Sequence, residues 1–204
     1  YSASGVLFYL APRHIRFDLK KLGDRQFLFG SNDDAHWTYS REEDRFYCGR
    51  HDLREEWPSG MPVRPDQIPA ALGLTPILGL GTTGVERVHR VDDEYQQVIF
   101  LVYDQGRLLI EKEYWLDRRP PRLIRRVIFR DAEGVVSMTS ELSDYRPLPG
   151  AGPSLPYSMV AEWRKEGARM EFDVGKWELV PQVRSGGPQF TTPPECEFGY
   201  DGTW

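Results

Sequence analysis

Hydrophobic runs rich in β-branched and aromatic residues, broken by polar turns, predict four antiparallel β-strands in succession between Glu94 and Tyr145. The stretch reads EYQQVIFLVYDQGRLLIEKEYWLDRRPPRLIRRVIFRDAEGVVSMTSELSDY, and turn residues at 104–106, 117–121 and 131–134 separate its β-branched and aromatic runs. This pattern is typical of hairpins. The connections are too short for the crossover helices that parallel strands need. We expect the rest of the chain to extend or cover this meander.

Residues on both sides of the meander predict further strands. From His14 to Lys20 every second side chain is apolar, so one face of that run is apolar and the other is polar. Turn residues recur about every ten positions through the first fifty residues, as in all-β folds. Residues 157–164 and 168–179 predict a last hairpin. The total is about eleven or twelve strands, and an open sheet of that size is expected to curl.

The middle of the chain predicts a cover for the curled sheet. Asp66 can cap a short helix that ends at Ala71 or Leu72, with Gly73 as its stop. Residues 75–84 are apolar and glycine-rich, which favours a covering loop or a second, irregular helix. We expect these segments to form a lid whose apolar side chains are Ile68, Leu72, Leu74 and Leu78.

The length of 204 residues favours one domain. We predict a β domain over residues 1–180, and then a proline- and glycine-rich arm over residues 181–204 that is mobile or lies across the sheet. The formal net charge is −5 and Lys and Arg form no long cluster, which argues against a nucleic-acid partner. The sequence lacks a run of about 18 apolar residues, so it predicts no membrane-spanning helix.

The chain begins at Tyr1 rather than Met, which favours a processed or a shortened protein from which any signal peptide has been removed. An upstream lipid anchor is compatible with this start. Cys48 and Cys196 are the only cysteines, too few for a structural zinc site. They could form a disulfide in an oxidising compartment, or stay as free buried thiols.

Two motifs that could bind a cofactor or a metal ion have simpler structural interpretations. Residues 79–84 match the GxGxxG pattern of dinucleotide-binding proteins. The strand and helix which that site needs around its glycines are not predicted, and this favours a lid hinge. Residues 32–36, with one Asn, two Asp and one His, could collect a cation, but a solvated hairpin turn is the simpler interpretation. We predict no metal and no cofactor.

Glu111 and Glu113 share one face of a predicted strand, and paired carboxylates can act as acid and base when burial separates their pKa values. Arginines on the next strand, at positions 122, 125, 126 and 130, offer cross-strand ion pairs instead. No serine lies in the GxSxG pattern of hydrolases. The sequence therefore predicts no catalytic residues and a protein that is not an enzyme.

Large aromatic and methionine side chains supply the best candidate for a binding site. If several face the concave side of the sheet, they line an apolar pocket of the kind that suits lipid tails, whereas the others form ordinary core. The predicted cavity-lining residues are Trp37, Phe100, Trp115, Met138, Met159, Trp163 and Phe172.

The order of these elements and several short motifs resemble the LolA/LolB superfamily of periplasmic lipoprotein carriers and its predicted lipoprotein relatives. The motifs are APRHIRF at 11–17, GSNDDAHWTY at 30–39, the hairpin at 122–145, and MPVRPD at 61–66 ahead of ALGL at 71–74. Over residues 5–180 the resemblance implies a mainly β fold, a curved, unclosed antiparallel half-barrel of about 11 strands with one or two short covering helices. The long N-terminal helix of the carriers has no counterpart here, which implies a more open cavity.

Resemblance and residues together predict a non-enzymatic protein of the bacterial periplasm or cell envelope. It would bind the acyl chains of a lipid or lipoprotein in an apolar cavity, and an upstream lipid anchor would associate it with a membrane. The alternative is a ligand-free structural or interaction module of the envelope. A third hypothesis is a small-ligand-binding or enzymatic β-barrel that uses Glu111, Glu113 or His36.

Overall fold

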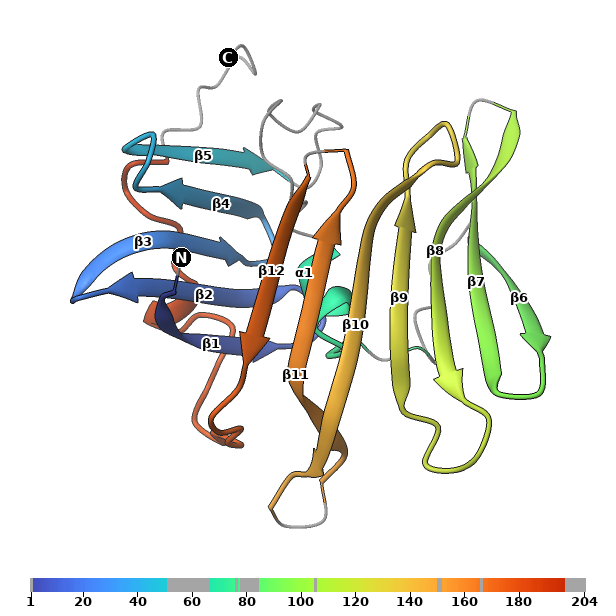
Figure 1. Cartoon of the computed structure of the whole chain (residues 1–204). Coiled ribbons are helices and arrows are strands. Elements are labelled where there is room, and N and C mark those ends of the chain that lie inside the picture. The colour runs from blue at the N-terminus through green and yellow to red at the C-terminus, as the bar shows by residue number, and fades with distance from the viewer. Residues whose placement is uncertain are drawn as a thin grey trace. The chain divides into compact units, whose positions relative to one another are not determined.

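The computed structural model of the chain describes residues 2–50, 67–75, 77, 85–104, 106–149, 152–165 and 167–196. Over these ranges the chain forms twelve β-strands, the α-helix α1 and the 3-10 helix η2. It divides into two compact units, one of residues 1–68 with 180–204 and one of residues 69–179, each with its own antiparallel sheet (Figure 1). The predicted mainly β fold is confirmed, and over the described residues neither sheet closes into a barrel.

The first unit contains a five-stranded sheet in which strands adjacent in sequence are adjacent in space. Its strands are β1 (Ser4–Leu10), β2 (His14–Lys21), β3 (Asp24–Ser31), β4 (Ala35–Ser40) and β5 (Arg45–Arg50). Leu22 and Gly23 have φ values of 51° and 92°, and two successive positive values suit a tight hairpin turn that matches the strand twist. At the next turn the side chain of Asn32 accepts hydrogen bonds from the amides of Asp34 and Ala35, which confirms the predicted hairpin turn.

The C-terminal segment, described over residues 180–196, packs with the five-stranded sheet. Cys48 on β5 and Cys196 form a disulfide across 148 positions of sequence. The segment also contains η2 (Pro188–Phe190), in which Phe190 is 1% exposed. The side-chain amide of Asn32 donates a 3.1 Å hydrogen bond to the carbonyl oxygen of Phe190. A covalent bond, a buried ring and a hydrogen bond therefore hold this segment against the sheet.

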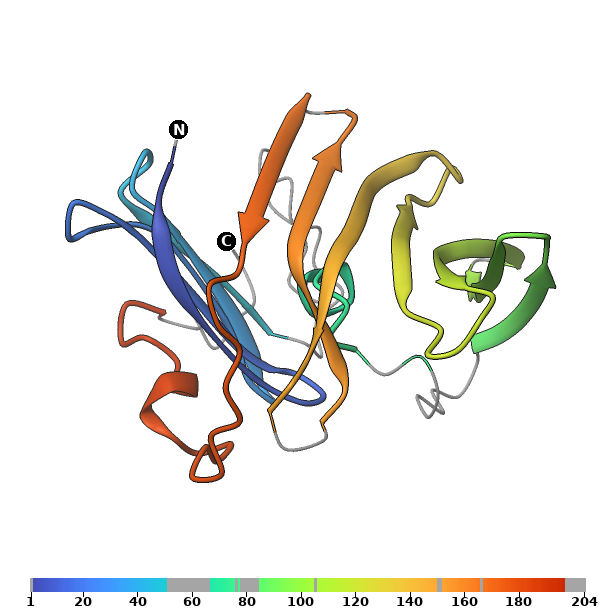
Figure 2. The ribbon, with the colours of Figure 1, turned by 60° about the horizontal axis from the view of Figure 1, so that its bottom comes forward.

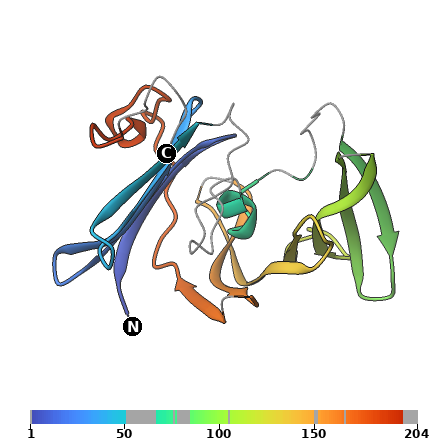
Figure 3. The ribbon, with the colours of Figure 1, turned by 90° about the horizontal axis from the view of Figure 1, so that it is seen from above.

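The second unit contains a seven-stranded sheet in the order β12-β11-β10-β9-β8-β7-β6. Its strands are β6 (Val85–Val91), β7 (Tyr95–Asp104), β8 (Arg107–Asp117), β9 (Ile124–Arg130), β10 (Val136–Pro147), β11 (Ser154–Trp163) and β12 (Ala168–Asp173). The four strands predicted between Glu94 and Tyr145 are confirmed as β7 to β10. The pairing register shifts once in each of the pairs β7–β8, β8–β9 and β9–β10, and such bulges bend a sheet. The sheet curls, so that β6–β8 turn away from β10–β12 (Figure 2, Figure 3).

The predicted short helix is present as α1 (Ile68–Ala71). It ends before Gly73, whose φ of 68° is the left-handed conformation that commonly stops a helix. The hydroxyl of Ser140 on β10 donates a 2.6 Å hydrogen bond to the carbonyl oxygen of Ala71, one of the carbonyls that the end of a helix leaves unpaired. The C-terminal end of α1 therefore lies against β10.

Some of the predicted lid falls outside the described residues, namely Asp66, Leu78 and the glycine motif at 79–84. Of the other predicted lid residues, Ile68 and Leu72 are buried and Leu74 is half-buried. Within the described part of the chain, no helix has the length and apolar character that crossing a membrane requires.

Candidate functional site

One face of the seven-stranded sheet is apolar across most of its width, and we call it the apolar face. Side chains that pair directly across antiparallel strands lie on the same face, and the register joins them into rows. The rows are Phe100, Lys112, Phe129, Met138, Trp163 and Ala168; Val98, Tyr114, Val127, Ser140, Ala161 and Met170; and Leu142, Met159 and Phe172. From β7 to β11 the apolar members of these rows are at most 5% exposed.

The apolar face brings together most of the predicted cavity-lining residues. They are Phe100, Met138, Met159, Trp163 and Phe172. Trp115 lies on the opposite face, because its cross-strand partners are Gln97 and Arg126. Its ring packs against the ring of Tyr95, with 5.8 Å between centroids, and under the guanidinium of Arg126. The structure therefore does not group Trp115 with the other predicted residues of this unit.

The indole N–H of Trp163 is a buried donor on the apolar face without a polar partner among the described residues. The side chain is 4% exposed, and its Nε1 has no hydrogen-bond acceptor among the described residues. Buried donors in folded proteins are nearly always paired, so an unpaired one needs an explanation. The donor lies at the end of β11, in the row that also contains Met138 and Phe129.

The two edges of the apolar face differ in character. Toward β6, the ring of Phe100 lies between two cations, with the guanidinium carbon of Arg87 at 5.2 Å and Nζ of Lys112 at 5.3 Å from its centroid. Such contacts stabilise a cation over an aromatic ring. At the other edge, on β12, Met170 is 36% exposed and Phe172 is half-buried. The face is therefore bordered by positive charge on one side and open to solvent at an apolar edge on the other.

The opposite face of the same sheet is held by ion pairs. Glu113 is 6% exposed, and its carboxylate lies 2.7 Å from the guanidinium of Arg130 on the next strand. Arg126 pairs with Glu141 at 2.7 Å on the solvent side. The predicted cross-strand pairing of Glu113 with an arginine is confirmed. Within the described ranges, no group of three His, Cys, Asp or Glu side chains is placed to hold a metal ion.

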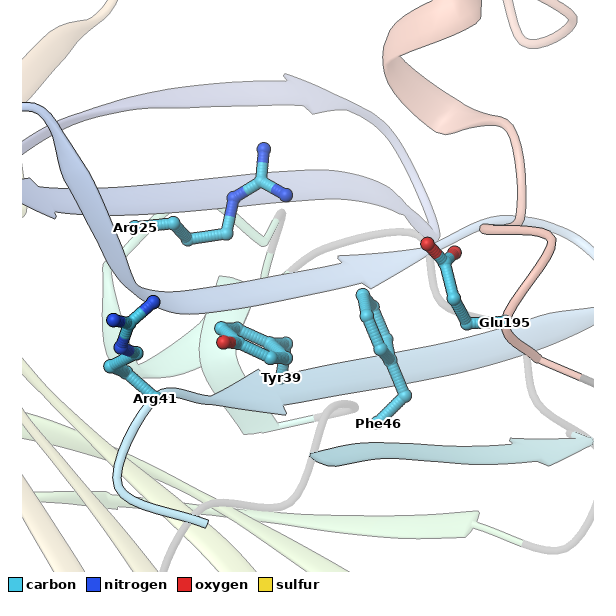
Figure 4. A pocket seen from close by; sticks show the side chains of 5 residues that line it. All are labelled: Arg25, Tyr39, Arg41, Phe46 and Glu195. Carbon is cyan, nitrogen blue, oxygen red and sulfur yellow. The ribbon is translucent and has the colours of Figure 1, made fainter. Parts of the chain in front are cut away.

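The five-stranded sheet carries a second candidate site. It is a pocket of about 160 Å³, called here the hairpin pocket, and it is lined by Arg25, Tyr39, Arg41, Phe46 and Glu195 (Figure 4). The rings of Tyr39 and Phe46, which line the pocket, pack against a buried cluster that contains Leu28, Trp37 and Cys196. The predicted cavity residue Trp37, which is 0% exposed, is therefore a core residue of this unit.

Sequence reasoning missed the hairpin pocket. Strand alternation places Tyr39 on the same face as Trp37, which was a usable signal. Glu195, however, reaches the pocket because its neighbour Cys196 is bonded to β5. The sequence left that bond open, so it could not place the C-terminal wall of the pocket.

Comparison with known proteins shows which solved structure shares this fold. No protein-family profile matches the sequence, and no curated protein matches it. A solved domain from Vibrio parahaemolyticus, named for outer membrane lipoprotein sorting, is similar with a TM-score of 0.52 and 13% identity over 87% of this chain and 77% of that one. The chain shares the fold of that domain. The fold expected from the LolA/LolB resemblance is thereby confirmed.

Two further solved structures are similar at lower scores. A DUF1329 family protein from Desulfovibrio piger has a TM-score of 0.49 and 12% identity over 83% of this chain and 72% of that one. A LolA superfamily protein from Nitrosomonas europaea has a TM-score of 0.46 and 12% identity over 79% of this chain and 70% of that one.

Proposed function

We propose that the apolar face binds the acyl chains of a lipid or of a lipoprotein, at the bacterial cell envelope and without catalysing a reaction. The indoles of Trp37, Trp115 and Trp163 all lack an acceptor among the described residues, and the observation that carries the proposal is that Trp163, alone of the three, lies on the apolar face. The ester or amide carbonyl of an acylated molecule would accept this hydrogen bond. Its chain would lie along the rows that contain Met138, Met159 and Phe172.

The chemistry of the apolar face suits such a ligand. Each methylene that leaves water contributes about 0.8 kcal/mol, and methionine side chains adapt readily to an irregular apolar partner. The proposed lid over the ligand is Ile68, Leu72, Leu74 and Leu78.

Further observations support the proposed location. A disulfide such as Cys48–Cys196 persists in oxidising compartments and is rare in the cytosol. A solved domain of the same fold is named for outer membrane lipoprotein sorting, which agrees with a carrier-type role. We treat residues 1–180 as a β domain of the LolA/LolB type and residues 181–204 as an extended arm. An upstream lipid anchor, if the full protein has one, would hold it at a membrane.

The experiment that tests the proposal is a titration of lipid-free protein with a fatty acid that carries an environment-sensitive fluorophore. The emission of the fluorophore itself is recorded, so that tryptophan substitutions do not change the signal. Trp163→Phe removes the donor and keeps an aromatic ring. We expect it to weaken binding about 2- to 10-fold, the value of one hydrogen bond. Trp115→Phe, on the opposite face, is the matched control and should leave the affinity unchanged.

A second variant tests the apolar edge. Met170→Glu places a charge at an exposed position of the apolar face, so it should weaken binding and keep the protein folded. Folding is checked by circular dichroism and by the urea midpoint. Saturable binding that Trp163→Phe and Met170→Glu weaken supports the proposal. The absence of saturable binding to folded wild-type protein, or an equal loss in Trp115→Phe, would reject it in favour of a ligand-free interaction module.

A further inference from the structure

The hairpin pocket has the composition of a small binding site rather than of a gap between core residues. Figure 4 shows Arg25 and Arg41 toward one end, Glu195 at the other, and the rings of Tyr39 and Phe46 between them. The two rings are tilted by 41° with 5.1 Å between centroids, so they form one aromatic surface. Cationic groups beside an aromatic surface can hold the anionic and the flat parts of one molecule.

Local structure fixes each wall of the pocket. The hydroxyl of Tyr39 donates a 2.9 Å hydrogen bond to Asp44. The backbone amide of Arg41 donates a 2.9 Å hydrogen bond to the carbonyl oxygen of Gln26, which closes the β3–β4 pair at this end. Glu195 immediately precedes the disulfide-bonded Cys196. A pocket whose walls are held in place loses little entropy when a ligand binds.

The charges of the pocket are not equivalent. Arg25 is already paired with Asp18, because its Nε and one terminal nitrogen donate hydrogen bonds of 3.1 Å and 2.9 Å to the Asp18 carboxylate. The guanidinium of Arg41 makes no hydrogen bond or ion pair within the described residues, although it faces the same pocket. Arg41 is therefore the cation available to a ligand, and a negatively charged ligand group would bind at its end of the pocket.

The size of the pocket limits the ligand. Its volume of about 160 Å³ is close to that of the engineered lysozyme cavity of roughly 150 Å³ that accommodates one benzene ring. A single ring with a short substituent fills this volume, whereas most of an acyl chain of lipid length would lie outside it. This site and the apolar face therefore differ in the class of ligand that they suit.

We propose that the hairpin pocket is a second binding site, for a small anionic molecule with a single flat ring. The ring would lie against Tyr39 and Phe46, and its carboxylate would accept hydrogen bonds from the guanidinium of Arg41. Glu195 at the far end disfavours a second negative charge, so a monoanion binds better than a dianion. The site is independent of acyl-chain binding, because none of its residues belongs to the apolar face.

Phenylacetate is a suitable probe, with phenethylamine and acetate for comparison. Binding is followed by amide chemical shifts of the ¹⁵N-labelled full chain, which report dissociation constants on the order of 1 mM, as expected for about ten non-hydrogen atoms. We expect phenylacetate to shift the amides of β4, β5 and residues near Cys196. Acetate lacks the ring and phenethylamine carries the wrong charge, so both should bind at least about tenfold more weakly.

Arg41→Gln tests the assigned role, because this exposed side chain has no structural partner among the described residues. The variant should weaken phenylacetate at least about tenfold, the value of a charge-assisted hydrogen bond. Arg13→Gln removes the same charge from an exposed turn outside the pocket and is the matched control. Glu195→Gln should leave binding unchanged or strengthen it.

Several results would overturn the proposal. They are the absence of pocket shifts with phenylacetate, binding of phenethylamine or acetate that is as tight as that of phenylacetate, and equal effects of Arg41→Gln and Arg13→Gln. Loss of binding in Glu195→Gln would also count against it, since that change removes only a repulsion. A negative result here leaves the acyl-chain titration unaffected, because the two experiments read different residues.

Discussion

The Cys48–Cys196 disulfide is expected to supply a large part of the stability of the unit with the five-stranded sheet. The bond closes a loop of 148 positions. The chain-entropy relation for a loop of that length gives about 5 kcal/mol at 25 °C. The hydrogen bond from Asn32 to the Phe190 carbonyl and the buried Phe190 ring still hold the segment when the bond is absent. We therefore expect a measured loss of about 2–5 kcal/mol in the Cys48→Ala/Cys196→Ala variant.

Urea unfolding followed by tryptophan fluorescence measures this loss. Trp37 is fully buried in the cluster that contains Cys196, so, of the tryptophans in the described part of the chain, it is the one whose environment changes when this cluster unfolds. Wild-type protein in a reducing agent should unfold at nearly the same urea concentration as the double variant, whereas the variant should not respond to the reductant. A double variant within about 0.5 kcal/mol of oxidised wild type would refute the argument, because segment packing alone would then fix the fold.

Three further predictions concern single side chains. Glu113→Gln should lower the free energy of unfolding by about 2–3 kcal/mol, since it breaks the ion pair between the buried Glu113 carboxylate and the partly buried Arg130, whereas Glu141→Gln, in a solvent-exposed pair, should cost less than about 1 kcal/mol. Ser140→Ala should cost about 1–2 kcal/mol in the same urea assay, because it leaves a buried carbonyl of α1 unpaired; no change would mean that α1 is not fixed by this contact. Burial opposes ionisation of Asp18, but hydrogen bonds and charge from its arginine partners outweigh it and hold its pKa below 3.8. The stability from this carboxylate is therefore present above pH 3.8 and lost as the pH falls through the lowered pKa, so urea midpoints of wild type and Asp18→Asn should converge in acid; parallel pH profiles would contradict this.

Most of the strand order was predictable because its signals are local. The runs between Glu94 and Tyr145 are bounded by turn residues, and the structure places β7 to β10 there. It was harder to predict from the sequence which side chains share one face of the sheet. Tyr114 and Trp115 are adjacent and both aromatic, so composition alone could not tell which one belongs to the apolar face. The register decides it, and bulges that the sequence does not mark shift that register.

The hairpin pocket could not be predicted for a different reason. Arg41 and Glu195 line one pocket although they are far apart in sequence, and the contact depends on the bond between Cys48 and Cys196. No local pattern around either cysteine indicates its partner. With only two cysteines the pairing was unique if it formed, but the sequence does not say whether it forms.

Reduction of the disulfide separates the two proposed sites. Glu195 adjoins Cys196, so loss of the bond releases one wall of the hairpin pocket and removes the preorganisation on which its affinity depends. Apart from the proposed lid, the residues proposed to line the acyl site lie between positions 100 and 172, within the unit that has no cysteine. Reductant should therefore weaken phenylacetate binding and leave the affinity for the fluorescent fatty acid unchanged. If both affinities fell together, the disulfide would be stabilising both units at once, and the two sites could not be treated as independent.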